Sequence, residues 1–138
     1  SMVALMSSPS AVLLSLGTIA PDSALLVHTE RDAEAAADVS TLARTTPHVQ
    51  DCDLTLQQVQ VCDYAAIRSA VSDRIRDHQG SSVVDVTGGT SGMTAAALVA
   101  AQLHDATIIH LRSRTTDYSF EVGTENIKVV RFRTCERK

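Results

Sequence analysis

Apolar and polar residues alternate in blocks along this chain, and the blocks predict strands and helices in turn. Short runs of Val, Leu, Ile and Ala between turn-forming residues indicate strands, whereas longer segments with apolar positions three or four residues apart indicate helices. The segments predicted to be strands are 3–8, 24–29, 52–56, 81–87 and 106–113. The segments predicted to be helices are 10–20, 31–44, 64–80 and 91–103.

Capping residues set the ends of the predicted helices. Ser10 is a suitable N-cap for the first helix, although the Gly and Thr near the end of that segment leave a strand open as an alternative. Asp63 is expected to cap the third helix, and Gly80 is expected to end it.

The order of these elements predicts an α/β fold. Strands that alternate with helices favour a mainly parallel sheet with helices on both faces, which is a Rossmann-like three-layer sandwich. Segments 118–123 and 127–133 both show two-residue alternation, so we expect a C-terminal β-hairpin at the sheet edge. Residues 1–138 are expected to form a single domain, and Ser1 before Met2 is interpreted as the remainder of a cleaved tag.

Composition narrows the possible functions. Hydrophobic residues make up 44% of the chain and charged residues 20%, as is typical of a soluble globular domain. A net charge of −4 and an aromatic content of 3% argue against binding to a long nucleic acid. No apolar run reaches the roughly 20 residues of a membrane span. The three cysteines lack CxxC spacing, so neither disulfides nor a zinc site is predicted. We therefore expect a cytoplasmic protein without a metal or a cofactor.

Four connections are expected to meet at one edge of the sheet. In α/β sheets of this kind, ligands bind outside the carboxyl ends of the strands, and the loops that follow those strands become neighbours. These loops are 7–10, 29–30, 87–92 and 112–114. The sequence therefore predicts a ligand site at this rim.

The loop with the sequence "TGGTSGMT", residues 87–94, carries the most informative chemistry. Its glycines let backbone amides approach a ligand, and the helix that follows leaves its first amides unpaired, with a partial positive charge. This arrangement favours an anion such as a phosphate. The hydroxyls of Thr87, Thr90 and Ser91 are additional donors. The alternative interpretation is a tight strand-to-helix connection with a simple cap.

Better-known glycine motifs do not fit the spacing of this loop. A phosphate loop would need Gly at the position of Met93 and a Lys after it, and G-x-G-x-x-G is absent. A nucleophile elbow would also need Gly at the position of Met93, two residues after Ser91. A serine hydrolase is therefore not expected.

The stretch "DVTGGTSGMTAAAL" resembles the TGGTK-x-M signature of CARF domains, the CRISPR-associated Rossmann-fold sensors of cyclic oligoadenylates. "VALMSSPS" is similar to their first strand and its ligand-contacting loop, and "PDSALLVHTE" to their second strand, which commonly ends in His-Thr. The order of elements agrees over nearly the whole chain. One position departs from the signature, because Ser91 stands where the family usually has Lys.

The resemblance implies a homodimer whose two rims face each other and bind a ring of linked adenylates, cyclic tetra-adenylate in preference to cyclic hexa-adenylate. A two-fold axis presents the same loop twice to a symmetric ligand. Met93 is expected either to pack under the loop or to contact a base, and Arg112 and Arg114 to supply the charge that Ser91 lacks. The residues expected at the ligand are Ser7, Ser8, Pro9, Thr29, Glu30, Thr87, Gly88, Gly89, Thr90, Ser91, Met93, Arg112 and Arg114.

Several functions remain open at this stage. The resemblance implies a sensor in type III CRISPR antiviral signalling, either free-standing or part of a longer protein with an effector domain. A second possibility is a ring nuclease without a metal, in which the ligand's own 2′-hydroxyl attacks the adjacent phosphate. In that case Ser7, Ser8, Thr90 and Ser91 would position the hydroxyl. A third possibility is a Rossmann-like domain that binds another nucleotide.

Overall fold

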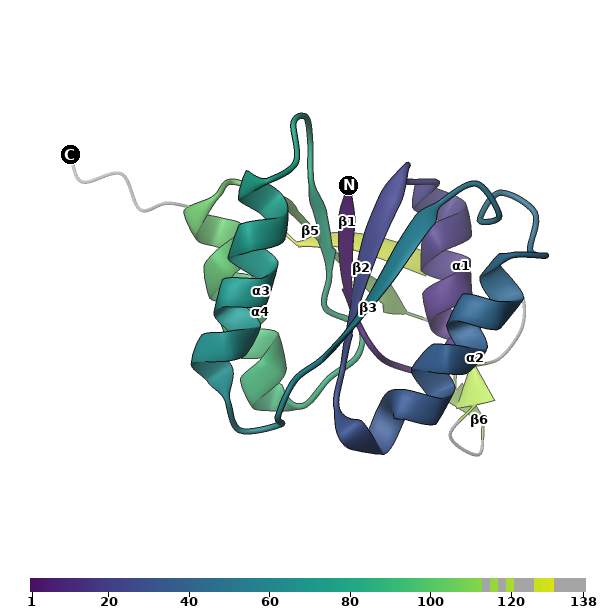
Figure 1. The fold of residues 1–138 in the computed structure, drawn as a ribbon, viewed down its shortest axis with the longest axis horizontal. Coiled ribbons are helices and arrows are strands. Elements are labelled where there is room, and N and C mark those ends of the chain that lie inside the picture. Colours follow the sequence, from purple (N-terminus) through teal and green to yellow (C-terminus); the bar gives the residue numbers. More distant parts are fainter. Residues whose placement is uncertain (113–114, 117–118, 121–125, 131–138) are drawn as a thin grey trace.

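A six-stranded sheet forms the middle layer of the molecule, and helices cover both of its faces (Figure 1). The computed structural model describes residues 1–112, 115–116, 119–120 and 126–130. The strands of this sheet are β1 (Met2–Leu5), β2 (Ser23–His28), β3 (Asp53–Gln58), β4 (Val83–Asp85), β5 (Thr107–Arg112) and β8 (Asn126–Val130). Their spatial order is β3-β2-β1-β4-β5-β8, and every neighbouring pair is parallel except β5 and β8. The predicted Rossmann-like α/β fold is confirmed.

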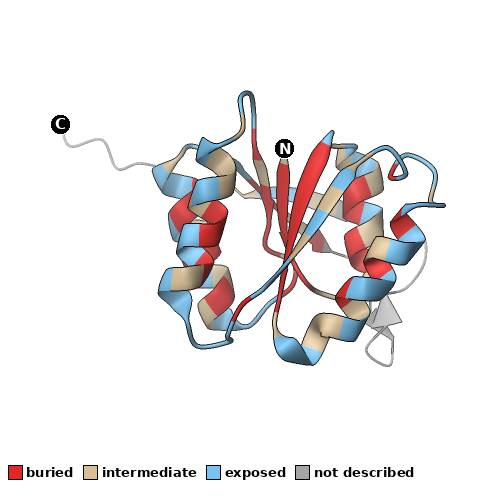
Figure 2. Ribbon diagram, viewed as in Figure 1, coloured by how far each residue is buried: buried red, intermediate tan, exposed pale blue. Residues whose placement is uncertain are grey.

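Two pairs of helices enclose the sheet. The helices are α1 (Pro9–Ile19), α2 (Ala33–Ala43), α3 (Tyr64–Arg76) and α4 (Ser91–Leu103), with a short 3-10 turn, η1 (Glu30–Asp32), before α2. Figure 1 shows α1 and α2 on one face and α3 and α4 on the other. One buried cluster includes Ile67 and Met93, and a second includes Leu16 and Leu26. The buried residues gather on the central strands and on the inward sides of the helices (Figure 2). In the described part of the chain, no helix has both the length and the apolar character needed to cross a membrane.

The strands differ in burial according to their place in the sheet. All residues of β1 and β2 are buried, because helices cover both faces of these central strands. The edge strand β3 alternates between half-buried and exposed residues over its first four positions, as its sequence predicts. It continues to Gln58, two residues past the predicted end, because the parallel pairing with β2 extends to His28 and Gln58.

The helix caps agree with the sequence in part. The segment at 10–20 forms a helix, but its cap is Ser8, whose Oγ accepts from the Ala11 amide at 3.2 Å. Pro9 occupies the first helical position, where its missing N–H costs nothing, so the helix begins earlier than Ser10 predicts. Asp63 caps α3 as predicted, accepting from the Ala66 amide at 3.1 Å.

The end of α3 differs from the predicted one, whereas both ends of α4 agree with it. α3 ends at Arg76, and Gly80 instead lies in the turn toward β4 with a positive φ of 110°. The boundaries of α4, Ser91–Leu103, are those predicted.

The antiparallel edge of the sheet is confirmed. β8 pairs with β5, from Ile108 opposite Val130 to Arg112 opposite Asn126. The expected partner of this strand was the segment 118–123, most of which lies outside the described residues. Its described part belongs to β7 (Ser119–Phe120), which pairs with β6 (Thr115–Thr116) in a separate two-stranded sheet.

Candidate ligand-binding site

The loop after β4 is fixed at its start by a buried carboxylate. Asp85 is 2% exposed, and its Oδ1 accepts hydrogen bonds from the Thr87 amide, at 2.9 Å, and from the Thr87 hydroxyl. The same hydroxyl accepts from the Leu111 amide at 2.8 Å. Thr87 was predicted to donate to a ligand, but its only hydroxyl proton is directed to Asp85. Thr87 therefore joins the loop to β5 within the protein.

The glycines of the loop allow close approach to the end of β1. A Cβ on Gly88 would lie 2.2 Å from the carbonyl oxygen of Met6, so no larger residue fits without movement of the backbone. Gly89 has a positive φ of 86°, which favours glycine, and its amide donates to the same oxygen at 3.1 Å. The amide of Met6 donates in turn to Val27 at 2.8 Å. The loops that follow β1 and β4 are therefore in backbone contact at one rim, as predicted.

The amides at the start of α4 are only partly satisfied within the protein. Thr90 is the N-cap, and its Oγ1 accepts from the Met93 amide at 3.3 Å. The first amides of a helix have no intrahelical acceptor. Among the described residues, none accepts from the amides of Thr90, Ser91 or Gly92. These three donors at the positive end of the helix remain available to an anion.

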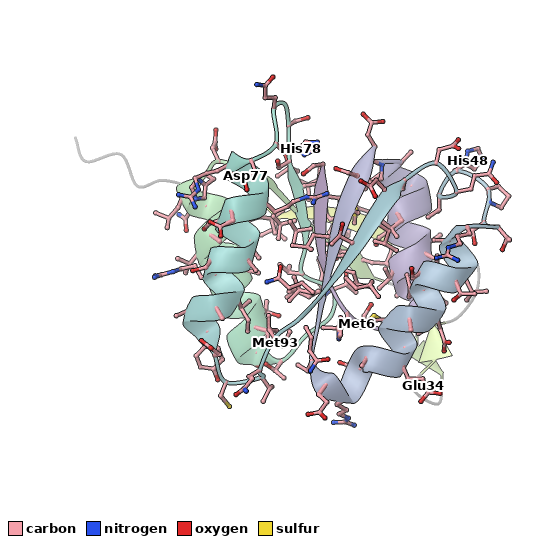
Figure 3. The ribbon with its side chains drawn as sticks, in the orientation of Figure 1. Met6, Glu34, His48, Asp77, His78 and Met93 are labelled. Atoms are coloured by element: carbon pink, nitrogen blue, oxygen red, sulfur yellow. The ribbon has the colours of Figure 1, made fainter. Side chains whose placement is uncertain are left out.

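A pocket of about 440 Å³ lies beside this helix start. Its size falls within the range of roughly 300–1,000 Å³ that is typical of small-molecule sites. Figure 3 shows Met93 near the start of α4 and Met6 at the same end of the sheet. The residues that line the pocket are Thr29, Arg31, Asp32, Val61, Gly89, Thr90 and Met93.

Four of the predicted ligand residues line this pocket: Thr29, Gly89, Thr90 and Met93. Met93 is 2% exposed and belongs to the buried cluster under α3 and α4, so it packs under the loop and also borders the pocket. The parallel strands thus bring the loops after β2 and β4 together, although about 60 residues of sequence separate them.

Sequence reasoning missed three residues of the pocket: Arg31, Asp32 and Val61. The segment from position 31 onward was interpreted as the start of a long helix, but η1 intervenes and places Arg31 and Asp32 beside the pocket. The "HTE" end of β2 was the available signal, because the residues that directly follow a strand end belong to the same rim.

Several predicted ligand residues do not line this pocket. Ser8 is occupied as the cap of α1, with Ser7 and Pro9 on either side, and Glu30 is exposed on η1. The remaining predicted residues divide as follows: Gly88 is buried against Met6, Ser91 is exposed at the start of α4, Arg112 ends β5, and Arg114 lies outside the described residues.

The charges at the pocket balance. Arg31 and Asp32 are the only charged residues among those that line it. The hydroxyl of Thr29 donates to Asp32 at 3.5 Å, which is a long contact. In the described part of the chain, no three side chains of His, Cys, Asp or Glu are grouped so that they could hold a metal ion.

The fold and the pocket together define a Rossmann-like α/β domain with a cavity at the carboxyl edge of its sheet. No protein-family model and no curated protein sequence matches the chain. Can2 from Sulfobacillus thermosulfidooxidans in complex with cyclic tetra-adenylate has 19% sequence identity and a TM-score of 0.70, covering 81% of this chain and 32% of that one. Enterococcus italicus Csm6 bound to cyclic hexa-2'-fluoro-hexa-dAMP has 13% identity and a TM-score of 0.67, covering 86% of this chain and 35% of that one.

These likenesses show the fold of the chain. They confirm, over most of its length, the fold that the resemblance to CARF domains predicts. The chain spans about a third of the length of either protein, 32% and 35% respectively.

Proposed function

We propose that this domain binds a cyclic oligoadenylate at the pocket beside α4 and acts as a sensor in type III CRISPR antiviral signalling. The observation that carries the proposal is the pocket between Thr29 and Thr90, where the helix start at Thr90, whose amide has no acceptor among the described residues, borders a cavity at the carboxyl edge of the sheet. Can2 and Csm6, two solved structures that share the fold, were determined with a cyclic adenylate and with an analogue of one, respectively.

The lining of the pocket suits a nucleotide. The Thr90 amide borders the pocket, and the amides of Ser91 and Gly92 follow it in the first turn of α4, so the positive end of this helix favours a phosphate there. Val61, which is 44% exposed, offers an apolar surface for an adenine, and the buried Met93 lies beneath the loop beside it. Thr29 lines the pocket, where its hydroxyl can bond to a ribose.

The same proposal includes a homodimer. A ring of four adenylates has repeated nucleotides, and two pockets related by a two-fold axis hold them without any new residue. A groove of about 410 Å³ runs between α3 and α4, lined by Tyr64, Val99 and other largely apolar residues. Tyr64 is 49% exposed and Val99 45% exposed, and Leu103, one turn beyond Val99, is 69% exposed. Gly92 lines this groove from the first turn of α4, next to the ligand pocket, so we place the dimer interface there.

Binding without cleavage is the preferred form of the proposal. No residue that lines the pocket is a His or a Lys, and Arg31 is its one cation, so a group that could protonate the leaving oxygen is missing from that lining. The sensor works in the cytoplasm, either alone or joined to an effector. In both cases the ligand pocket is the same.

The experiment is a titration of the purified chain with cyclic tetra-adenylate, cyclic hexa-adenylate and AMP, followed by calorimetry and melting curves. We expect one ring per two chains and a higher melting temperature, because a ligand that binds only the folded state stabilises it. Stabilisation by AMP alone would replace the proposal with an ordinary nucleotide-binding domain.

Chromatography of the ligand after long incubation tests the enzyme alternative. We expect the ring to be recovered intact. Linear products that form without added metal would instead establish a ring nuclease.

A further inference from the structure

Arg31 occupies a position at the pocket that the sequence does not reveal. It lies in η1, directly after β2, where the Asp32 amide bonds to the Thr29 carbonyl at 3.1 Å and turns the chain toward α2. This turn places Arg31 on the side of the pocket formed by the loop after β2, whereas Gly89 and Thr90 come from the loop after β4. Arg31 and the start of α4 therefore line the cavity from different elements.

The charge of Arg31 is available to a ligand. Its side chain is exposed, and among the described residues the one ion pair is between Arg76 and Asp73, on α3. A guanidinium presents five donors in a planar fork that matches phosphate geometry. Since Arg31 is the pocket's single cation, an anionic ligand in this cavity has one strong partner besides the helix amides.

We propose that Arg31 binds a phosphate of the ligand and supplies the positive charge that Ser91 does not. The sequence assigned this role to Arg112 and Arg114. The inference rests on the proposed function, since it assigns one contact within the same site. A helix start alone provides about half a unit charge, less than a phosphodiester carries, so a neighbouring cation strengthens binding.

The test compares Arg31→Ala and Arg31→Lys with wild type in titrations with cyclic tetra-adenylate, cyclic hexa-adenylate and AMP. We expect Arg31→Ala to weaken binding of the favoured ring about tenfold to a hundredfold, as the loss of a charged hydrogen bond does. Arg31→Lys retains the charge but not the planar guanidinium, so we expect an affinity for the ring between those of wild type and Arg31→Ala. Added salt should weaken binding by wild type more steeply than binding by Arg31→Ala.

Arg44→Ala is the matched control. Arg44 is exposed at the far end of α2, roughly 20 Å from Arg31 along the helix axis. The Arg44→Ala substitution removes the same charge from the protein without changing the pocket beside α4. The affinity of this variant for the ring should therefore equal that of wild type. The melting temperature of all three variants without ligand should also stay at the wild-type value, because both arginines are exposed.

The outcomes separate this inference from the proposed function. If wild type binds a ring and Arg31→Ala binds it equally well, the inference is wrong and the function stands. Equal losses in Arg31→Ala and Arg44→Ala would mean that net charge, not this contact, governs affinity, which also overturns the inference. If wild type binds neither a ring nor AMP, both fail. If only AMP binds and Arg31→Ala weakens it, the phosphate contact is real but the ring assignment is wrong.

Discussion

Gly88 lies against the carbonyl group of Met6, so close that a Cβ at position 88 would be 2.2 Å from that oxygen. The next residue, Gly89, donates its amide to the same oxygen at 3.1 Å. This contact joins the end of β1 to the loop that precedes α4. The glycine-rich loop therefore serves the fold as well as the proposed ligand, because its position at the rim depends on backbone contact with Met6.

Gly88→Ala is expected to destabilise the protein by about 2 kcal/mol or more, since overpacking against backbone forces the loop away from β1. Urea unfolding measures the change. Gly17→Ala is the control, because a Cβ there would meet only Val49 Cγ2, at an ordinary 3.7 Å. Inside helix α1 the added methyl should stabilise by about 0.5–1 kcal/mol. Equal stabilities of Gly88→Ala and wild type would show that the two loops are not tightly joined.

Thr87→Val is expected to cost about 1–3 kcal/mol, because it leaves the Leu111 amide without its acceptor and removes one donor from buried Asp85. Thr87→Ser keeps the hydroxyl and should retain most of the stability. Thr45→Val is the matched control, since the Thr45 hydroxyl bonds to Leu42 on an exposed surface, and its removal should change stability by less than about 0.5 kcal/mol. If Thr87→Val and Thr45→Val unfolded at the same urea concentration as wild type, the hydroxyl would not hold the loop.

The elements of the fold could be predicted because hydrophobic periodicity is a local signal. Each of the segments predicted to be helical contains a helix, and α4 has the predicted ends. The helix ends that differ from the predicted ones depend on capping and turn geometry, which hydrophobic periodicity does not indicate. Pro9 can occupy the first helical position only if Ser8 is the cap, and the structure adopts this arrangement instead of a cap at Ser10.

The candidate site was less predictable because it depends on contacts between distant segments. The rule that ligands gather at the carboxyl ends of strands located the rim and three residues of the pocket, Thr29, Gly89 and Thr90, and the resemblance to CARF domains added Met93. The rule does not indicate that the Thr87 hydroxyl accepts a hydrogen bond from the amide of Leu111, 24 positions away. The position of Arg31 beside the pocket was also not predicted, because helix propensity alone does not indicate the short turn at η1.

Cys52 is expected to react slowly with iodoacetamide near neutral pH. Burial, and secondarily the carboxylate of Asp53, raise the pKa of its thiol above the ordinary value. A raised thiol pKa means that the reactive thiolate forms only at higher pH, so the alkylation rate should rise later with pH in the folded protein than in urea. The measurement uses a variant that retains only this cysteine, Cys62→Ser with Cys135→Ser. Superimposable pH profiles for the folded and unfolded protein would contradict the environment described for Cys52.

Val99→Glu is expected to separate the proposed homodimer while leaving the protomer folded. Val99 is 45% exposed on the groove between α3 and α4, so a carboxylate there is solvated in the monomer, but the interface would bury it twice, once in each copy. The dissociation constant of the dimer should rise by at least about tenfold, measured by sedimentation velocity with and without cyclic tetra-adenylate. Leu42→Glu is the matched control, since Leu42 is similarly exposed, at 47%, but lies on α2, on the opposite face of the sheet. If Leu42→Glu dissociated the dimer and Val99→Glu did not, the interface would lie on the α1–α2 face, and the two ligand pockets would have to meet in a different arrangement.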